Sequence, residues 1–205
     1  MGYLLDVITG KIGLQNVLLA NNVEKITKRI KSYPKTSFTN IWATYCVFTI
    51  FSFLMEMFFK DKSEFTKYLR MNVRRLDEQI AFEIFKLLGG FHLAIFLYNE
   101  NTDDHLKDLG VNKDSFIKDI FSIFDYSSKD INHYKSFYTK DFAPSSMEIY
   151  CIKIYEQIIK LIDVPEPKNI YSDSQYFGRL LADQHIHVFL KALQNRLSQL
   201  DQKIS

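Results

Sequence analysis

Apolar residues recur along most of this chain at intervals of three and four, the spacing that places side chains on one face of an α-helix. The two-residue alternation of β-strands is almost absent. The clearest stripe contains five apolar residues at steps of four, three, four and three: Met147, Cys151, Ile154, Ile158 and Leu161. Just ahead of it, Ser145 and Glu148 have the spacing of a capping box, which marks the start of a helix. The pattern therefore predicts a chain of helices.

Composition narrows this prediction to a fold class. The 205 residues include 18 Phe and 12 Tyr but only 7 Gly and 4 Pro, so aromatic side chains are plentiful and chain breakers are few. We expect an all-α protein in which six to nine helices pack as an irregular bundle around an aromatic-rich core. Residues 1–205 are expected to form a single helical domain, with a soft division at the polar segment 99–110 between an N-terminal and a C-terminal half.

Several helix boundaries can be predicted from breaker residues. A helix is expected to begin at Asp61 or Ser63 and to run to about Leu88, where the Gly89-Gly90 pair ends or bends it. A second apolar piece follows at 91–98. The segment 99–110 is expected to be a loop with a single helical turn, and the last helix is expected to run from about Ser174 to the C-terminus.

The most unusual stretch is residues 36–55, which contain no formal charge and whose apolar part extends through Phe59. Its length lies at the boundary between a membrane-spanning helix and a helix buried in a soluble core. A stripe of polar residues along one face favours the buried helix, because lipid requires no such stripe. We call this set the polar stripe: Tyr45, Thr49, Ser52, Glu56 and Lys60. If it borders a cavity, its first four members form the best candidate ligand site.

The last helix narrows toward its end to a strict three-and-four repeat, which we call the C-terminal seam: Ile186, Leu190, Leu193, Leu197, Leu200 and Ile204. A narrow apolar seam suits one partner helix. The repeat covers fewer than three heptads, so it is too short for an autonomous coiled coil. Two readings stay open, packing against the protein's own bundle and an interface with a partner or a second copy.

Charge and cysteine content exclude some classes of function. The formal net charge is +2, which gives no electrostatic commitment to nucleic acid, and none is expected as a partner. The two cysteines, Cys46 and Cys151, lie within apolar helical patterns and are expected to be reduced core residues. The N-terminal sequence is a poor secretory signal because Asp6 interrupts its apolar part. We therefore expect a cytoplasmic protein without a cofactor.

Catalytic and metal-binding signatures are weak. Among the five histidines, His185 and His187 follow Asp183, but a straight helix points His185 about 200° away from Asp183, so no metal site is expected there. His185 is expected to be exposed or hydrogen-bonded. Metal-independent helical ribonucleases use an Arg and a His at a spacing that Arg179 and His185 match, although Leu180 stands where a polar residue is usual.

These observations rank three classes of function. The leading hypothesis is a non-enzymatic helical protein that acts through protein contacts, with self-association through the C-terminal seam as one form. The alternative is a binder or sensor of an apolar small molecule in an aromatic-lined helical pocket beside the polar stripe. A ribonuclease that uses Arg179 and His185 as its catalytic pair comes third.

Overall fold

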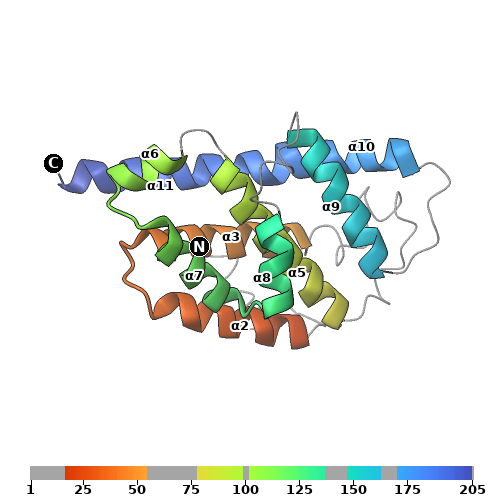
Figure 1. The fold of residues 1–205 in the computed structure, drawn as a ribbon, viewed down its shortest axis with the longest axis horizontal. Coiled ribbons are helices and arrows are strands. Elements are labelled where there is room, and N and C mark those ends of the chain that lie inside the picture. Colours follow the sequence, from red (N-terminus) through yellow and green to blue (C-terminus); the bar gives the residue numbers. More distant parts are fainter. Residues whose placement is uncertain (1–16, 55–77, 99–101, 137–146, 163–169, 205) are drawn as a thin grey trace.

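The computed structural model describes residues 17–54, 78–98, 102–136, 147–162 and 170–204 (Figure 1). These residues form helices joined by short turns, so the expected all-α class is confirmed. The helices are, in chain order, α2 (Val17–Lys31), α3 (Phe38–Leu54), α5 (Glu78–Tyr98), α6 (Thr102–Asp108), α7 (Lys113–Phe124), α8 (Ser128–Ser136), α9 (Met147–Ile162), α10 (Ile170–Leu180), the π-helical turn η4 (Leu181–Ile186) and α11 (His187–Ile204).

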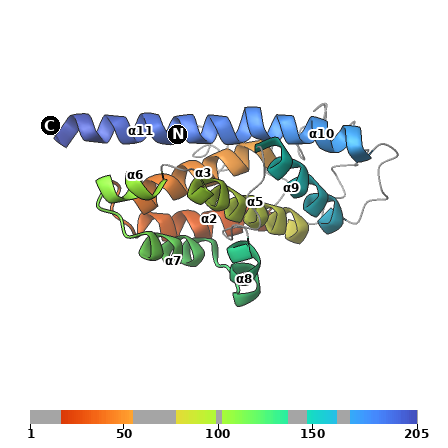
Figure 2. The same ribbon diagram turned by 45° about the horizontal axis from the view of Figure 1, so that its top comes forward.

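The C-terminal part of the chain forms one long rod. Figure 2 shows α10, η4 and α11 running straight across one side of the molecule, with α7 and α8 on the opposite side. At 1.5 Å per residue this rod is about 50 Å long. It packs on α9 near its beginning and on α3 further along. We refer to α10, η4 and α11 together as the C-terminal rod.

Helix α3 lies inside the bundle, as the polar stripe had indicated. It carries no formal charge, and it is buried on most of its circumference because α2, α5, α7 and α11 all pack against it. Among the described helices, one stretch is long and apolar enough to cross a membrane, by length and composition alone. This stretch is Gln79–Leu97 of α5. Of that stretch, 78% is buried inside the fold, which is also the property of a core helix in a soluble protein.

Aromatic rings form the centre of the core. Trp42 of α3 is completely buried and makes edge-on contacts with Phe116, Phe124 and Phe189, at centroid distances of 5.7, 6.5 and 5.7 Å. These partners come from α7 and α11, so the described parts of the chain before and after 99–110 share a core. The single domain with a soft division at 99–110 stays a prediction.

The expected break at Gly89-Gly90 is wrong, because α5 continues through both glycines. A Cβ atom on Gly89 would lie 2.6 Å from a ring carbon of Phe124, and one on Gly90 would lie 2.5 Å from the ring of Tyr134. The two glycines therefore let α7 and α8 bring aromatic rings directly onto the backbone of α5. The start expected at Asp61 or Ser63 lies outside the described residues.

Two further boundaries differ from the expectation. Residues 102–108 form a helix of two turns rather than a loop with one turn, since Leu106 is buried and anchors α6 to the core. The last helix begins at Ile170, and a π-helical turn interrupts its regular geometry. In that turn the N–H of His187 donates to the carbonyl of Ala182, five residues earlier instead of four.

Candidate functional site

Helix α7 is fixed at both ends by local hydrogen bonds. Its N-cap, Asn112, accepts a hydrogen bond from the N–H of Ser115 at 2.9 Å. At the other end Asp125 adopts the left-handed conformation (φ 59°), and the N–H of Tyr126 donates to the carbonyl of Phe121 at 3.1 Å. This pattern ends a helix sharply and turns the chain toward α8.

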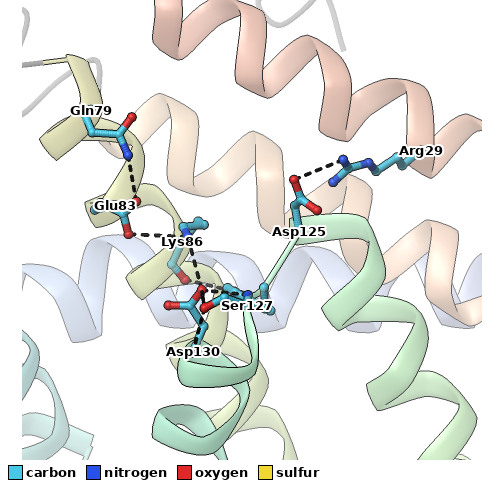
Figure 3. Close-up of polar contacts among 8 residues, drawn as sticks. Arg29, Gln79, Glu83, Lys86, Asp125, Ser127 and Asp130 are labelled. Carbon is cyan, nitrogen blue, oxygen red and sulfur yellow. Dashed lines mark hydrogen bonds and ion pairs between the residues drawn. The ribbon is translucent and has the colours of Figure 1, made fainter.

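Helix α8 is held against α5 by a cluster of polar side chains (Figure 3). Ser127 caps α8, because its hydroxyl oxygen accepts from the N–H of Asp130 at 3.2 Å, and the Asp130 carboxylate accepts in return from the N–H and the hydroxyl of Ser127, at 2.8 and 2.7 Å. The same carboxylate lies 3.3 Å from Nζ of Lys86, which also approaches Glu83 at 3.4 Å. In addition, Tyr126 donates its hydroxyl hydrogen to the carbonyl of Lys86 at 2.9 Å. We call Glu83, Lys86, Ser127 and Asp130 the Lys86 cluster.

Opposing effects act on the carboxyl group of Asp130. Partial burial raises its pKa, but the hydrogen bonds from Ser127 and the charge of Lys86 outweigh burial and leave the pKa below its usual value. The Lys86 side chain itself is only 11% exposed, so its ion pairs are partly shielded from water. The Lys86 cluster is therefore a structural joint between α5 and α8.

Between α7 and α8 lies a surface groove with a volume of about 510 Å³, which we call the α7–α8 groove. Its apolar floor is made by four side chains from α7, the connecting turn and α8: Ile117, Phe121, Tyr126 and Ile131. Its rim is polar and carries charges of both signs: Asp114, Lys118, Ser122, Asp125 and Lys135. An apolar floor with a few polar groups around it is typical of binding sites.

The rim charges differ in their partners. Asp125 pairs with Arg29 of α2, whose terminal nitrogen lies 3.3 Å away (Figure 3). Asp114, Lys118 and Lys135 form no ion pair with any described residue. The side chains of both lysines are exposed. Two cations and one acid are thus free to meet a partner at the edge of the groove.

A second unusual site lies in the core, where His92 of α5 meets His185 of η4. Both side chains are 1% exposed, and their ring centroids are 4.6 Å apart with the planes perpendicular. Phe53 stacks on His185 at 4.4 Å, and Phe189 lies 4.8 Å from His92. We call His92 and His185 the histidine pair.

The hydrogen bonding of the histidine pair is incomplete. Nδ1 of His92 lies 2.6 Å from the carbonyl of Leu88, so this nitrogen carries the hydrogen and the lone pair of a neutral ring is on Nε2. Neither Nε2 has a hydrogen-bond partner among the described residues. Burial lowers the pKa of His92 to about 4. It lowers the pKa of His185 well below its usual value, and repulsion from His92 lowers it further.

The predicted ligand site is only partly described. Tyr45, Thr49 and Ser52 are half-buried on α3, and Glu56 and Lys60 lie outside the described residues. The hydroxyl of Thr49 donates to the carbonyl of Tyr45 at 2.7 Å, so it is satisfied within its own helix. The α7–α8 groove lies elsewhere and contains none of these residues.

The C-terminal seam faces the protein's own core along most of its described length. Ile186, Leu193 and Leu197 are 0, 2 and 5% exposed, while Leu190 and Leu200 are half-buried. The side chain of Ile204 lies outside the described set. Because α11 packs on α3, the seam serves intramolecular packing in this structure, the first of the two readings left open by the sequence.

The two residues of the ribonuclease hypothesis do not form a joint site. Arg179 is exposed on α10, whereas His185 is enclosed in the core. The expectation that His185 would be exposed is wrong, because this ring lies in the core against His92 and Phe53. Its Nε2 has no hydrogen-bond partner among the described residues. Within the described residues, no three His, Cys, Asp or Glu side chains come together as a metal site.

Comparison of the chain with protein-family models, with curated proteins and with solved structures finds no match. Function must therefore be inferred from the residues and their geometry.

Sequence patterns did not identify either site. His92 sits in an apolar run, and nothing in its neighbourhood indicates that it meets a histidine 93 positions later. The groove depends on the left-handed turn at Asp125, which brings α8 back beside α7. A signal for that turn was present, since Asp tolerates the left-handed conformation better than most residues.

Proposed function

We propose that this protein acts through protein contacts and that its α7–α8 groove receives an amphipathic helix from a partner protein. The observation that carries this proposal is the combination of an apolar floor with rim lysines that pair with no described residue. An amphipathic helix fits such a surface by laying its apolar face on the floor. Ile117 and Ile131 are half-buried and supply contact area that the fold itself leaves open.

Charge specifies the partner further. Lys118 and Lys135 are exposed and unpaired among the described residues, so a partner helix with acidic residues beside its apolar face complements the groove. Such pairs steer association and fix the orientation of the helix more than they add affinity. The free Asp114 disfavours a second acidic group at its own end of the groove, which gives the bound helix one preferred direction.

Site-specific photocrosslinking tests this proposal. A photoreactive phenylalanine analogue is placed at Ile117, and the full chain is irradiated in cells of its source organism. The control carries the same group at Lys160, which is exposed on α9 and is not among the residues that line the groove. A protein adduct at Ile117 that is absent at Lys160 is the expected result. An adduct with a second copy of this chain, with a small molecule, or at both positions would overturn the proposal.

The cross-linked segment is then synthesised as a peptide, and its affinity is measured by fluorescence anisotropy. We expect Ile117→Glu to weaken binding at least about tenfold, because it places a charge on the apolar floor. Joint reversal of Lys118 and Lys135 to Glu should weaken binding most at low salt, since salt screens exposed charges. Equal affinities for these variants and for Lys160→Glu would rule out the groove.

A second candidate is self-association through the C-terminal rod. Val188, at 55% exposure, is the most exposed large apolar side chain among the described residues, and it lies on the outer side of α11. Two copies that bury this residue would form a dimer without undocking the seam. Sedimentation of the intact chain and of Val188→Lys tests this: a dimer that becomes a monomer supports it, and two identical profiles exclude it.

A further inference from the structure

The histidine pair sits at the joint between the C-terminal rod and the rest of the fold. His185 belongs to η4, the one irregular turn of the rod, and His92 belongs to α5. Phe53 of α3 and Phe189 of α11 cover the two rings, with centroid distances of 4.4 Å to His185 and 4.8 Å to His92. The pair thus lies where the C-terminal rod meets α3 and α5, so the protonation of either ring affects the contact of the rod with both helices.

No described carboxylate accompanies the pair in the core. Helix α3 has no formal charge. The elements that pack on η4 carry their described charged side chains at exposed positions, apart from the half-buried Arg196 of α11, which donates to Gln199: Lys153, Glu156 and Lys160 on α9, and Arg179, Asp183, His187 and Lys191 on the rod. Among the helices that pack on α5, Asp103 and Asp104 of α6 are exposed, Glu24 of α2 pairs with Lys28, and Glu83 and Asp130 belong to the Lys86 cluster. The titratable groups buried in α3 and α9 are Cys46, Cys151 and Tyr155.

Among the described residues, an imidazolium ion at this place would therefore lack a counter-ion. Burial of an unpaired charge is strongly unfavourable. A second imidazolium would lie at a centroid distance of only 4.6 Å from the first. The pair is stable in the core only while both rings are neutral, and the shift of the two pKa values to low pH has the same physical cause.

The π turn gives the rod a second arrangement. A π turn contains one residue more than a regular α-helical turn, and such turns are frequent at functional sites. If the extra residue were absorbed, the two ends of the rod would rotate relative to each other by about 100°. That rotation would carry His185 out of the core and leave α10 and α11 unable to dock at the same time.

We propose that the histidine pair is an acid-sensitive latch, whose protonation expels His185 from the core and releases the C-terminal rod from α3 and α5. Release uncovers the C-terminal seam, including Ile186, Leu193 and Leu197, which the docked rod buries. The chain would then present an apolar helix for contact only in an acidic environment. This mechanism does not involve the α7–α8 groove, which is lined by residues of α7, α8 and the turn between them.

The chain contains its own reporter of the latch. Trp42 is the only tryptophan, it is fully buried, and its ring meets Phe189 of α11 edge-on at 5.7 Å. Undocking of α11 exposes Trp42 and shifts its fluorescence to longer wavelength. Far-ultraviolet circular dichroism, recorded on the same samples, distinguishes release of an intact helix from general unfolding, because release retains the helical signal.

The experiment is an acid titration of the full chain and two variants. The double variant His92→Leu/His185→Phe has no titratable side chain at either position. The control His187→Gln removes an exposed histidine two positions after His185 on the same rod. We expect the wild-type fluorescence to change between pH 6.5 and 4 with helicity retained. The midpoint should move about one pH unit lower in the double variant and stay unchanged in His187→Gln. Identical midpoints for the wild type and the double variant would overturn the latch.

Two measurements on the wild type guard against a variant that fails to fold. Hydrogen exchange at pH 5 should accelerate first in residues 181–193, and equal acceleration in all helices would overturn the latch. Proton NMR then follows the protonation state of the two rings of the histidine pair. The rings of the pair should remain neutral until the rod is released. Their titration near pH 6.5 in the docked protein would also overturn the proposal.

Discussion

Helix α5 carries a half-buried polar site at Lys86 and a buried one at His92, and the two are built in opposite ways. Lys86 and His92 are six residues apart, about 9 Å along the helix. Lys86 has two carboxylate partners within 3.4 Å, and one of them, Asp130, also accepts from Ser127 at the start of α8. His92 has a backbone partner at one nitrogen only, and neither its Nε2 nor that of its neighbour His185 has a hydrogen-bond partner among the described residues. The first site joins two helices, and the second weakens the joint that it occupies.

This contrast shows how to separate structural from functional polar groups in a core. A buried polar atom without a partner costs about 1–3 kcal/mol, and that cost is avoided wherever partners are supplied. The Lys86 cluster follows this rule. The histidine pair departs from it at the only π turn among the described residues, where an apolar pair would be more stable. A costly feature at an irregular turn indicates selection for something other than stability.

The largest effect should come from acidification. The His92 pKa is about 4 in the fold and 6.5 as a free side chain, so the unfolded chain binds a proton more readily. The contribution of this group is complete above pH 6.5 and is lost as pH falls toward 4. The shift of about 2.5 units corresponds to about 3 kcal/mol. Urea unfolding at pH 7 and pH 4 measures this loss. The double variant His92→Leu/His185→Phe should lose at least about 3 kcal/mol less than the wild type, and equal losses would contradict the prediction.

The Lys86 cluster should respond in a different pH range. The pKa of Asp130 is below its usual 3.8, so its contribution to stability persists above pH 3.8 and disappears only at lower pH. At pH 4, therefore, the contact between α5 and α8 should remain while the histidine pair is destabilised. Hydrogen exchange at pH 4 checks this: α8 should stay protected after α11 has lost protection, and the reverse order would contradict the contrast between the sites.

Next in size is the effect of filling the space at Gly90. A side chain there collides with the ring of Tyr134, because even a Cβ atom would lie 2.5 Å from it. We expect Gly90→Val to cost about 1–3 kcal/mol in urea unfolding and to displace α8, so that Lys86 loses Asp130. Gly110→Asn is the matched control. Nothing lies within 4 Å of that position, and Asn tolerates its positive φ of 65°. A stable Gly90→Val protein with an intact cluster would refute the role given to the glycine.

A smaller effect is expected from Asp130→Ala, which removes the carboxylate that accepts from Ser127 at the start of α8 and that pairs with Lys86. We expect the free energy of unfolding to fall by about 1–2 kcal/mol in total. The double variant Lys86→Met/Asp130→Leu should be more stable than the sum of the two single variants predicts, because no unpaired charge is left. Strict additivity in the double-mutant cycle would mean that the two side chains act independently.

The smallest effect should come from Arg29→Gln. Arg29 pairs with Asp125 and donates to the carbonyls of Ser122 and Ile123 at the end of α7, but both ion-pair members are substantially exposed. Exposed pairs contribute about 0–1 kcal/mol, so the variant should unfold within that range of the wild type at low salt and closer to it at 1 M salt. A fall in the free energy of unfolding of more than about 2 kcal/mol would contradict this prediction. Arg29 would then stabilise the fold as strongly as the Lys86 cluster does.

Periodicity was sufficient to predict the fold class and the buried position of α3, because both follow from which faces of each helix are apolar. It failed where two segments meet. In the sequence alone, the two glycines of α5 predict the end of a helix. Their role is seen only in the structure, where the rings of Phe124 and Tyr134 pack against them. The burial of His185 depends on the π turn, and no rule of helical spacing predicts one extra residue in a turn. The groove likewise requires the mutual placement of α7 and α8.

Gly89 and Gly90 also constrain how the sequence of this protein evolves, because their substitution is coupled to that of Phe124 and Tyr134. A chain that descends from the same ancestor can acquire a side chain at either glycine only if Phe124 or Tyr134 shrinks as well, because the rings occupy the space that a Cβ atom would need. Substitutions in these two regions should therefore occur as pairs. As related sequences accumulate, this covariation would identify members of the lineage even after the rest of α5, α7 and α8 has diverged.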